Sequence, residues 1–515
     1  MQSNSTPLLT VHLFVLKNNS LSGFAEMLKR LNEAGITVKF YESDDDLLDI
    51  NPKNPRVYVS LGESDYQFTT LYNLPYHERK RWLHYKSPTD VQPDYLFYCW
   101  LNRTDPLPEN KIIPDTHFSS DIPLVSVFTS AYKSKEKIQR PYVSLLNQTY
   151  TNWEWVIVDD SGDDDVTYKQ DLLKLDDPRV RRYRQDCGNG YIGATKRYAA
   201  SLCTGEILVE VDHDDELISD CLEKIVNALK KHPECGFVYG DCAEPYAGSN
   251  FSNWYGWDCG FGYDIYYRVW VHKMNRWQNV LRNTILNGTT IRHLVGLPNH
   301  PRAWTRECYH LLGGHREELL VADDYDILVR SFLCTKYLCI PDLLYIQYRN
   351  ENGDNSTFTR NKQIQILVSE LYKYYSKRIH ERVKELGVHE YVSYSRVWER
   401  EENDTALNAA NIINEDSLRI SMLFPIPYSC TAINYDQLFD TIKNGLETNF
   451  KDIEVVVVGN IPKEIETLAS KAPMGAIRWW GMEQSDSLET CIKYAKFCSS
   501  CKEKLIILPE QVQNN

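Results

Sequence analysis

Three aspartates that follow a short apolar run are the residues whose types and spacing most clearly predict chemistry. The run from Glu206 to Val211 is rich in branched apolar residues, and Asp212, Asp214 and Asp215 come directly after it. Such a run predicts a buried strand, and open α/β sheets bind ligands at the carboxyl ends of their strands. Two carboxylates about 4 Å apart repel each other by roughly 4 kcal/mol near a protein surface, and a divalent cation removes that repulsion. Hard carboxylate oxygens suit Mg²⁺ or Mn²⁺. An isolated Asp-x-Asp is more often a solvated acidic loop, and it is its surroundings in this sequence that favour a metal-binding edge.

A second acidic pair, Asp159 and Asp160, follows the predicted strand Trp153–Val158. Parallel strands present their carboxyl ends at the same edge of a sheet, so this pair should lie near Asp212. The alternative for Asp159 and Asp160 is a structural role in a turn or at a helix cap.

The chain of 515 residues is too long for one core and divides by its pattern into three blocks. We call residues 1–118 the N-terminal block, 119–395 the central block and 417–515 the C-terminal block. The N-terminal block alternates apolar runs with one helical stretch, Gly23–Ala34, which predicts a small parallel α/β sheet. Its apolar runs are Leu8–Leu16, Ile36–Tyr41, Arg56–Leu61 and Tyr95–Leu101. It contains no Gly-x-Gly-x-x-Gly turn, so dinucleotide binding is not supported.

The central block is expected to supply the elements that position the acids. It opens with a predicted strand, Pro123–Thr129, and a helix between Ser134 and Gln148. After Asp215 a helix is expected near Cys221–Lys231, with Asp220 and Glu223 as its capping pair. Strands that alternate with helices indicate a parallel sheet that delivers two acidic pairs to one edge.

The C-terminal block repeats part of the central block. The aligned segments are Trp153–Asp160 with Ile453–Asn460, Val180–Tyr183 with Ile477–Trp480, and Lys196 with Lys493. The acids are missing from the copy: Gly459 and Asn460 replace the first pair, and Pro509 and Gln511 fall where Asp212 and Asp214 should be. The copy is therefore expected to be an incomplete, non-catalytic half domain.

Composition and charge exclude several classes of function. With 43% hydrophobic residues a large core can be buried, and a net charge of −14 argues against nucleic-acid binding. The amino terminus lacks the features of a signal peptide, and no apolar stretch approaches the roughly 20 residues that span a bilayer. Fourteen cysteines without a secretion signal predict reduced thiols and a cytoplasmic location. The Cys498-x-x-Cys501 pair lacks a second ligand pair, which argues against a zinc site.

The central block resembles family 2 glycosyltransferases of the GT-A fold, over about half the chain. The resemblance is carried by the order of seven motifs: Val125–Tyr132, Ser144–Tyr150, Trp153–Ser161, Gly193–Arg197, Val211–Asp215, Gly313–His315 and Ala322–Arg330. It implies an α/β fold class, with a Rossmann-like GT-A catalytic domain between a small N-terminal α/β domain and a degenerate, incomplete GT-A-like repeat.

The resemblance also implies a donor site for a nucleoside-diphosphate sugar, most simply a UDP-sugar. The residues it assigns are Thr129, Ala131 and Tyr132 at the base and ribose, Asp159 and Asp160 at the base, Lys196 at the diphosphate, and Asp212 and His213 beside the ribose. In the family, the aspartates matched by Asp212 and Asp214 hold Mn²⁺ or Mg²⁺, which bridges the phosphates and stabilises the leaving group. Many members add a His after the last strand, but Tyr345–Glu351 contains none. Water, His300 or His315 is left for that third ligand position.

By the same resemblance Asp324, with Asp323 as its neighbour, is the base that takes the proton from the acceptor hydroxyl. A lone base and in-line attack imply inversion at the anomeric carbon. Both acids also suit the start of the predicted helix Tyr325–Phe332, because acids there interact favourably with the helix dipole. The acceptor side is assigned to His300, Arg302, Trp304 and His315. Trp304, Trp254 and Trp257 could stack on sugars, but burial in the core is the commoner use of Trp.

Two alternatives belong to other classes of protein. A sugar-nucleotide pyrophosphorylase should carry a Gly-rich phosphate-binding signature near its first strand, and Thr129–Tyr132 is not one. A non-catalytic glycan-binding or assembly subunit suits the C-terminal block, but Asp212, Asp214 and Asp324 argue against it for the central block. The expected partners are a nucleotide-sugar donor and a glycan or glycoconjugate acceptor. The outer blocks are expected to position the acceptor or to form a homo-oligomer.

Overall fold

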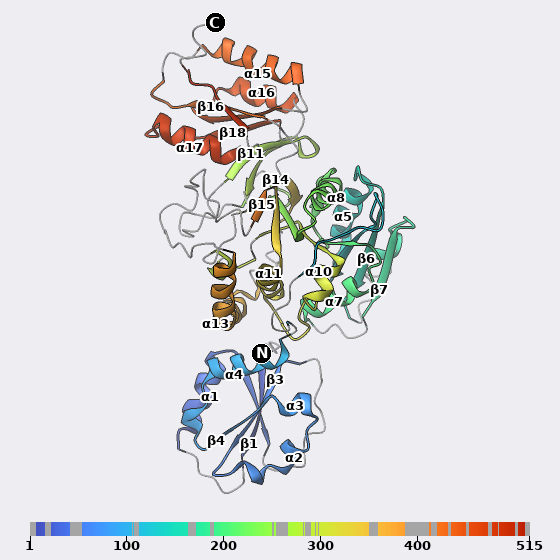
Figure 1. Cartoon of the computed structure of the whole chain (residues 1–515), viewed down its shortest axis with the longest axis vertical. Helices are drawn as coiled ribbons and strands as arrows, with labels where there is room; N and C mark the ends of the chain where they lie inside the picture. Colours follow the sequence, from blue (N-terminus) through green and yellow to red (C-terminus); the bar gives the residue numbers. More distant parts are fainter. Residues whose placement is uncertain are drawn as a thin grey trace.

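The computed structural model describes most of the chain, and its three blocks lie one above another along the long axis (Figure 1). The described residues are 7–15, 22–41, 54–105, 107, 113–162, 171–185, 190–249, 252–253, 266–281, 283, 290–293, 295–296, 298–349, 359–386, 411–413, 420–430, 434–449, 453–471, 476–482, 484–499 and 503–509.

The N-terminal block contains a four-stranded parallel sheet with the strand order β2-β1-β3-β4. Its elements are β1 (Leu9–Val15), α1 (Phe24–Glu33), β2 (Ile36–Tyr41), β3 (Arg56–Leu61), α2 (Thr69–Tyr72), α3 (Tyr76–Arg79), β4 (Trp82–Tyr85) and α4 (Pro93–Thr104). The apolar run Tyr95–Leu101 was expected to be a strand and is helical instead. Pro93 occupies the first turn of α4, where its missing N–H costs nothing. The sequence pattern also missed β4, because its four residues are all only half-buried.

The central block is built around a mixed sheet. Its elements are β5 (Val125–Ala131), α5 (Gln139–Leu146), β6 (Trp153–Asp159), β7 (Val180–Arg184), α7 (Ile192–Ser201), β8 (Ile207–Glu210), β9 (Glu216–Leu217), α8 (Cys221–Lys231), β10 (Cys235–Ala243), β11 (Tyr266–Val271), β12 (Arg276–Leu281), α9 (Thr290–His293), β13 (Arg302–Thr305), α10 (Arg306–Leu311), α11 (Asp323–Cys334), β14 (Lys336–Ile346), α13 (Asn361–Glu385) and β15 (Asn411–Ile413). Strands β7, β6, β5 and β8 are parallel, and β13 runs antiparallel between β8 and β10. The carboxyl ends of β5, β6 and β8 therefore meet at one edge, as the sequence predicted.

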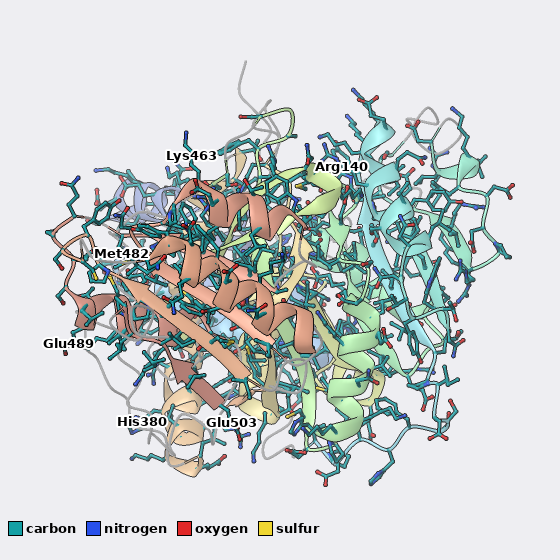
Figure 2. The ribbon with its side chains drawn as sticks, turned by 90° about the horizontal axis from the view of Figure 1, so that it is seen from above. Arg140, His380, Lys463, Met482, Glu489 and Glu503 are labelled. Atoms are coloured by element: carbon teal, nitrogen blue, oxygen red, sulfur yellow. The ribbon has the colours of Figure 1, made fainter. Side chains whose placement is uncertain are left out.

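The C-terminal block repeats the strand order of the central sheet. Its elements are β16 (Ile420–Ile426), α15 (Tyr435–Asn449), β17 (Ile453–Gly459), α16 (Lys463–Lys471), β18 (Ile477–Gly481), α17 (Leu488–Cys498) and β19 (Glu503–Ile506). Strands β19-β16-β17-β18 follow the same order as β8-β5-β6-β7, and all are parallel. Figure 2 looks down on this block, in which Lys463, Met482, Glu489 and Glu503 are labelled. Within the described residues, antiparallel pairing of β18 with β11 joins the two sheets into one of fifteen strands.

The strand registers correct the predicted alignment of the repeat. Val125 pairs with Ile207 in the central sheet, and its counterpart Ile420 pairs with Glu503. The position of Asp212 therefore corresponds to Leu508 rather than Pro509. That of Asp214 corresponds to residue 510 rather than 511, and residues 510 and 511 lie outside the described residues. A one-residue slip of this kind is invisible in an alignment that contains few identical residues.

The predicted helix-capping contacts also differ from the structure. Helix α8 spans Cys221–Lys231 as predicted, but the side chain of Asp220 makes no capping hydrogen bond, and Glu223 instead accepts one from the Thr149 hydroxyl at 2.7 Å. Helix α11 begins at Asp323, so Asp323 and Asp324 lie in its first turn and do not precede it as caps. The residue before the helix, Ala322, is in the left-handed conformation (φ 60°). Among the described helices, none is long and apolar enough to span a membrane.

Candidate functional site

The three aspartates after β8 differ in their surroundings. The side chain of Asp212 is 33% exposed, and Asp214 is partly exposed, with its carbonyl accepting a hydrogen bond from Arg140 at 2.9 Å. Asp215 is buried, and its carboxylate accepts hydrogen bonds from the Tyr345 hydroxyl (3.0 Å) and the Tyr348 amide (2.7 Å). Burial, with Asp214 and Asp212 nearby, raises the pKa of Asp215. Asp215 therefore fixes the loop after β8 to the end of β14, whereas the side chains of Asp212 and Asp214 remain partly exposed to solvent.

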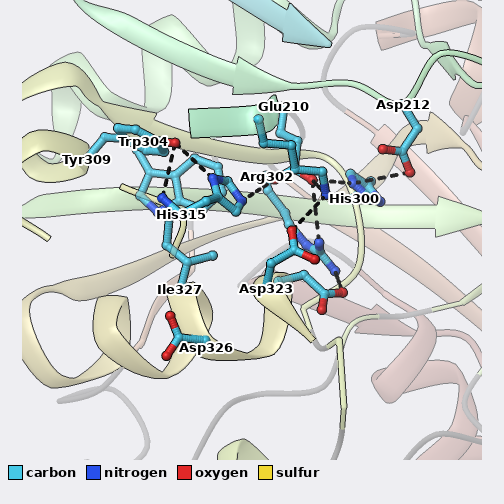
Figure 3. Close-up of polar contacts among 12 residues, drawn as sticks. Glu210, Asp212, His300, Arg302, Trp304, Tyr309, His315, Asp323, Asp326 and Ile327 are labelled. Atoms are coloured by element: carbon cyan, nitrogen blue, oxygen red, sulfur yellow. Dashed lines mark hydrogen bonds and ion pairs between the residues drawn. The ribbon is translucent and has the colours of Figure 1, made fainter. Parts of the chain in front are cut away.

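Glu210, the last residue of β8, is the centre of a buried cluster of charges that the sequence analysis did not identify (Figure 3). Its carboxylate lies 2.7 Å from Lys196 Nζ, 3.8 Å from Arg302 Nη1, and 3.5 Å from the Nε2 atoms of both His300 and His315. Burial alone would raise the pKa of Glu210, but Lys196, the two histidines and Arg302 lower it well below its usual range. A glutamate inside an otherwise apolar strand was the available signal, because a buried carboxylate needs compensating charge.

Lys196 lies between two acidic groups rather than in solvent. It projects from α7, is buried, and its Nζ lies 3.4 Å from Asp323 Oδ2 as well as 2.7 Å from Glu210. Burial alone would lower its pKa, but Asp323 and Glu210 raise it well above the usual value. Lys196 is therefore a buried, ion-paired cation rather than a flexible or solvated one, and its predicted role at the diphosphate stays a prediction.

Asp324 lies in the first turn of α11 and is held by Arg302. The Nη2 of Arg302 is 3.3 Å from Asp324 Oδ2, and this guanidinium also donates to the carbonyls of Gly296 (3.1 Å) and Pro298 (3.2 Å). The Asp324 side chain remains 30% exposed. Burial would raise its pKa, but Arg302 and Lys196 lower it. Asp324 is thus ionised at neutral pH and reachable, as a base must be. Arg302 was assigned to the acceptor, but it is buried and orients this carboxylate.

Three side chains can hold a metal ion at the end of β8. Ligand atoms of Glu210, Asp212 and His300 all lie within 4.8 Å of one another. His300 Nε2 is 3.9 Å from Asp212 Oδ2, and its ring stacks on Tyr345 with centroids 4.8 Å apart. A nitrogen and two carboxylates are a donor set that suits Mn²⁺ or Mg²⁺. Within the described residues Asp214 is not part of this group, so its predicted role as a ligand stays a prediction.

Two of the residues predicted to lie at the base and ribose of the donor, Thr129 and Ala131, are buried and hold the strand ends together. Thr129 donates its hydroxyl hydrogen bond to Val211 O (2.7 Å) and accepts one from the Trp155 indole (2.9 Å). Ala131 is buried and its carbonyl accepts from the Asp160 amide (2.8 Å). These contacts fix the ends of β5 and β6 against β8.

The other side chains that were predicted to contact the donor differ in their exposure to solvent. Asp159 and Asp160 are buried, and Asp159 Oδ1 accepts hydrogen bonds from Ser161. Tyr132 is 52% exposed, with Lys133 Nζ 5.2 Å from the centre of its ring. Tyr132 thus offers the open flat face that the sequence predicted, and His213 is partly exposed in the aspartate loop.

Two residues assigned to the acceptor belong to the core instead. Trp304 is fully buried, donates to Ser331 Oγ (3.0 Å) and packs against Phe237 and Tyr309. His315 is fully buried on the far side of Glu210, with Nδ1 2.8 Å from the Tyr309 hydroxyl. Both side chains are enclosed by protein in this structure, and their predicted contacts with an acceptor stay predictions. Trp254 and Trp257 lie outside the described residues.

Glu210→Gln is expected to lower the free energy of unfolding by about 3–5 kcal/mol, because it leaves buried Lys196 and Arg302 without their shared anion. Since the folded-state pKa of Glu210 is lowered, this stabilisation is present at neutral pH and is lost as pH falls below the usual glutamate range. Urea denaturation measures the change. Glu489→Gln, whose side chain is 80% exposed and pairs with Lys493 at 3.4 Å, is the matched control and should cost less than about 1 kcal/mol. An equal loss in both variants would contradict the central role of Glu210.

Comparison with known families identifies one segment of the central block. Residues 126–286 match the family model described as "Glycosyl transferase family 2". This match confirms the predicted resemblance over those residues, which contain β5 to β8 and the aspartate loop.

Several curated relatives are similar over the same region. A chondroitin synthase of Escherichia coli is 28% identical over 294 residues, which are 55% of this chain and 37% of the relative. A hyaluronan synthase of Pasteurella multocida is 27% identical over 48% of this chain and 23% of its own length. The Escherichia coli protein "UDP-Glc:alpha-D-GlcNAc-diphosphoundecaprenol beta-1,3-glucosyltransferase WfgD" is 30% identical over 23% of this chain and 45% of its own length. The chain thus spans less than half the length of each of these relatives.

Solved structures show a weaker likeness. Residues 1–349 of S. aureus TarS in complex with UDP-GlcNAc align with 44% of this chain and 59% of that chain, at 18% identity and a TM-score of 0.32. The Pyrobaculum calidifontis mannosyltransferase PcManGT in complex with GDP-Man and Mn²⁺ aligns with 58% of this chain and 84% of that chain, at 15% identity and a TM-score of 0.31. Scores at this level do not establish a shared fold.

Proposed function

We propose that this chain, whose residues 126–286 belong to glycosyl transferase family 2, transfers a sugar from a nucleoside-diphosphate donor to a hydroxyl of a glycan acceptor. The proposal rests on one buried cluster of charged side chains with a partly exposed carboxylate at each end. Asp212 is 33% exposed at the end of β8, Asp324 is 30% exposed at the start of α11, and Glu210 with Arg302 joins them. A donor bound at the first carboxylate would present its anomeric carbon to an acceptor at the second.

Proton removal from the acceptor is assigned to Asp324. Its lowered pKa keeps it ionised, and Arg302 fixes the direction of its carboxylate. Asp323 is buried against Lys196 instead, and its pKa is raised by burial, so it supports α11 and does not serve as the base. A single positioned base favours direct displacement, with inversion at the anomeric carbon.

A divalent cation fits the donor end of the cluster. Glu210, Asp212 and His300 would hold it, since their ligand atoms converge within 4.8 Å and two of these side chains are buried. When bound, such an ion neutralises the diphosphate and stabilises the leaving nucleotide. Lys196 and Arg302 already balance part of the charge of Glu210, so the chain's own residues keep the site together.

The donor is proposed to be a UDP-sugar and the acceptor a growing polysaccharide. The name of the 30% identical relative specifies UDP-Glc, and the relatives that match the most residues are polysaccharide synthases. We assign the fold of the central block to GT-A, with acids from β6 and β8 at one edge of its sheet. We further propose domains at 1–118, 119–395 and 417–515, and a cytoplasmic location.

The test is a panel of nucleotide sugars incubated with Mn²⁺ and the purified chain, followed by quantification of released nucleoside diphosphate. Release from at least one UDP-sugar, increased by a glycan acceptor, is expected. Asp121→Asn, at an exposed loop position, is the control for general effects of removing an acid. Release from no donor in the panel, with the protein folded, would contradict the proposed function.

A further inference from the structure

The central sheet contains a set of contacts around one arginine that the C-terminal block repeats. In the central copy, Arg181 Nη1 of β7 lies 2.8 Å from Glu154 Oε2 and donates to Leu202 O at 2.9 Å. Glu154 also accepts a hydrogen bond from Ser126 on β5 at 2.6 Å. The motif therefore ties three strands, β5, β6 and β7, to the end of helix α7 near the outer edge of the sheet.

The C-terminal copy retains the same motif. Arg478 Nε of β18 lies 3.4 Å from Glu454 Oε2, and its Nη1 donates to Cys498 O at 3.0 Å. Ser421 on β16 donates to Glu454 at 3.0 Å. These equivalences align α17 with α7 and correct the predicted pairing of Lys196 with Lys493. The counterpart of Lys493 is Arg197, and the side chains of these two residues are 44% and 43% exposed.

Arg478 makes contacts that Arg181 does not. The side chain of Arg181 is 33% exposed, whereas that of Arg478 is 1% exposed because the central block covers it. Arg478 stacks on the ring of Tyr267 at 4.4 Å, and its Nη2 lies 3.3 Å from Pro341 O and 3.5 Å from Asp342 Oδ1. A structural arginine of the repeat is therefore also its attachment to the central block.

From Tyr267 a buried series of hydrogen bonds leads to the candidate metal group. The Tyr267 hydroxyl donates to Asp241 Oδ2 (2.9 Å), and Asp241 Oδ1 accepts from the backbone N–H of Asn283 (2.9 Å). The side-chain Oδ1 of Asn283 in turn accepts from the backbone N–H of Asn299 (2.9 Å), the residue before His300. Each of these residues is at least nine-tenths buried. The backbone next to His300 is thus connected through these hydrogen bonds and Tyr267 to Arg478 of the C-terminal block.

We propose that the C-terminal block is a fixed support for the His300 segment, with Arg478 and Tyr267 as its positioning residues. The inference rests on the proposed function in that His300 is taken as a metal-binding group. His300 Nε2 lies 3.5 Å from Glu210 and 3.9 Å from Asp212, so a small displacement of its backbone separates the donor set. Loss of such supporting hydrogen bonds around a metal site lowers its affinity about 10–100-fold.

Tyr267→Phe tests the series without removing the ring beneath Arg478. We expect faster amide hydrogen exchange over residues 298–305 and an about tenfold higher Mn²⁺ concentration for half-maximal binding, measured by electron paramagnetic resonance with Mn²⁺ alone. Turnover at saturating Mn²⁺ should stay within about twofold of wild type. Tyr58→Phe is the matched control, because Tyr58 is an equally buried tyrosine that donates to a carboxylate (Glu78, 2.9 Å) in the N-terminal block. Unchanged exchange over 298–305 in Tyr267→Phe would overturn the proposal.

Arg478→Met and Arg181→Met compare the two copies of the motif. Exchange over residues 298–305 should increase in Arg478→Met, recover in part in Arg478→Lys, and stay at the wild-type rate in Arg181→Met. An increase confined to residues 420–509 in Arg478→Met would make the arginine a local residue of the repeat and would overturn the proposal. Hydrogen exchange requires no sugar transfer, so this outcome is independent of the donor panel, which alone tests the proposed function.

Discussion

Replacement of Asp324 with Asn should lower turnover by about 10²–10⁴-fold while donor affinity changes little, because the amide cannot accept the proton of the acceptor hydroxyl. The substitution keeps the shape of the side chain and one oxygen to accept from Arg302 Nη2, which now lies 3.3 Å from the carboxylate. Steady-state transfer kinetics give kcat, and calorimetric titration with UDP gives the affinity of the donor site. Because the pKa of Asp324 is lowered, the base is ionised above that value, so wild-type activity should be lost only as pH falls below the usual carboxyl range.

Asp436→Asn is the control for Asp324→Asn. Asp436 is also the second residue of a helix, α15, and it is exposed in the C-terminal block. Both substitutions remove one acid from a first helical turn and so carry a similar small helix-dipole cost. Asp436→Asn should therefore leave kcat unchanged. A loss of UDP affinity in Asp324→Asn as large as its loss of turnover would make Asp324 a binding residue.

The sequence predicted the sheet edge that carries the candidate site, because that edge depends on local patterns. Branched apolar runs followed by acids located β6 and β8, and parallel pairing brought their ends together. Asp212 was identified by its position directly after a predicted strand, and Asp324 by the family resemblance. The family resemblance then supplied their proposed roles.

The supporting charges could not be predicted, because they depend on contacts between distant segments. Glu210, Lys196 and Arg302 come from β8, α7 and β13, and only the fold shows that they share one buried cluster. Arg302 and His315 were assigned to the acceptor because their motif precedes the base, yet both side chains point into the protein. Sequence position gives an order of residues along the chain, but it does not give the direction of a side chain.

The C-terminal repeat shows the same limit. The repeat was found by aligning its segments with those of the central block, but the alignment near the end of the chain was one residue off. The contact of the repeat with the central block was not apparent from the sequence. Arg478 aligns with Arg181 in sequence and forms the same internal contacts, so nothing in the alignment distinguishes them. The difference lies in Tyr267 and Asp342, which belong to the other block.

The second large effect is expected from Asp212→Asn, which should reduce transfer by a factor on the order of 10³, comparable to the loss of one group that stabilises developing charge. Asp212 is the exposed carboxylate of the candidate metal group, whereas Glu210 and His300 beside it are buried. An amide removes the negative charge that attracts the cation and preserves the size of the side chain. Asp214→Asn should show a similar loss if Asp214 also contacts the ion.

Chelation separates the role of the metal in this effect from a direct role of Asp212. Excess EDTA should abolish transfer by the wild-type chain, and added Mn²⁺ should restore it. The residual activity of Asp212→Asn should be insensitive to EDTA, because an ion that is no longer held cannot be removed. Asp121→Asn, exposed and outside the site, should respond to EDTA as the wild type does. Full wild-type activity in excess chelator would refute the metal-binding role of Asp212, since the cluster would then act through its own charges alone.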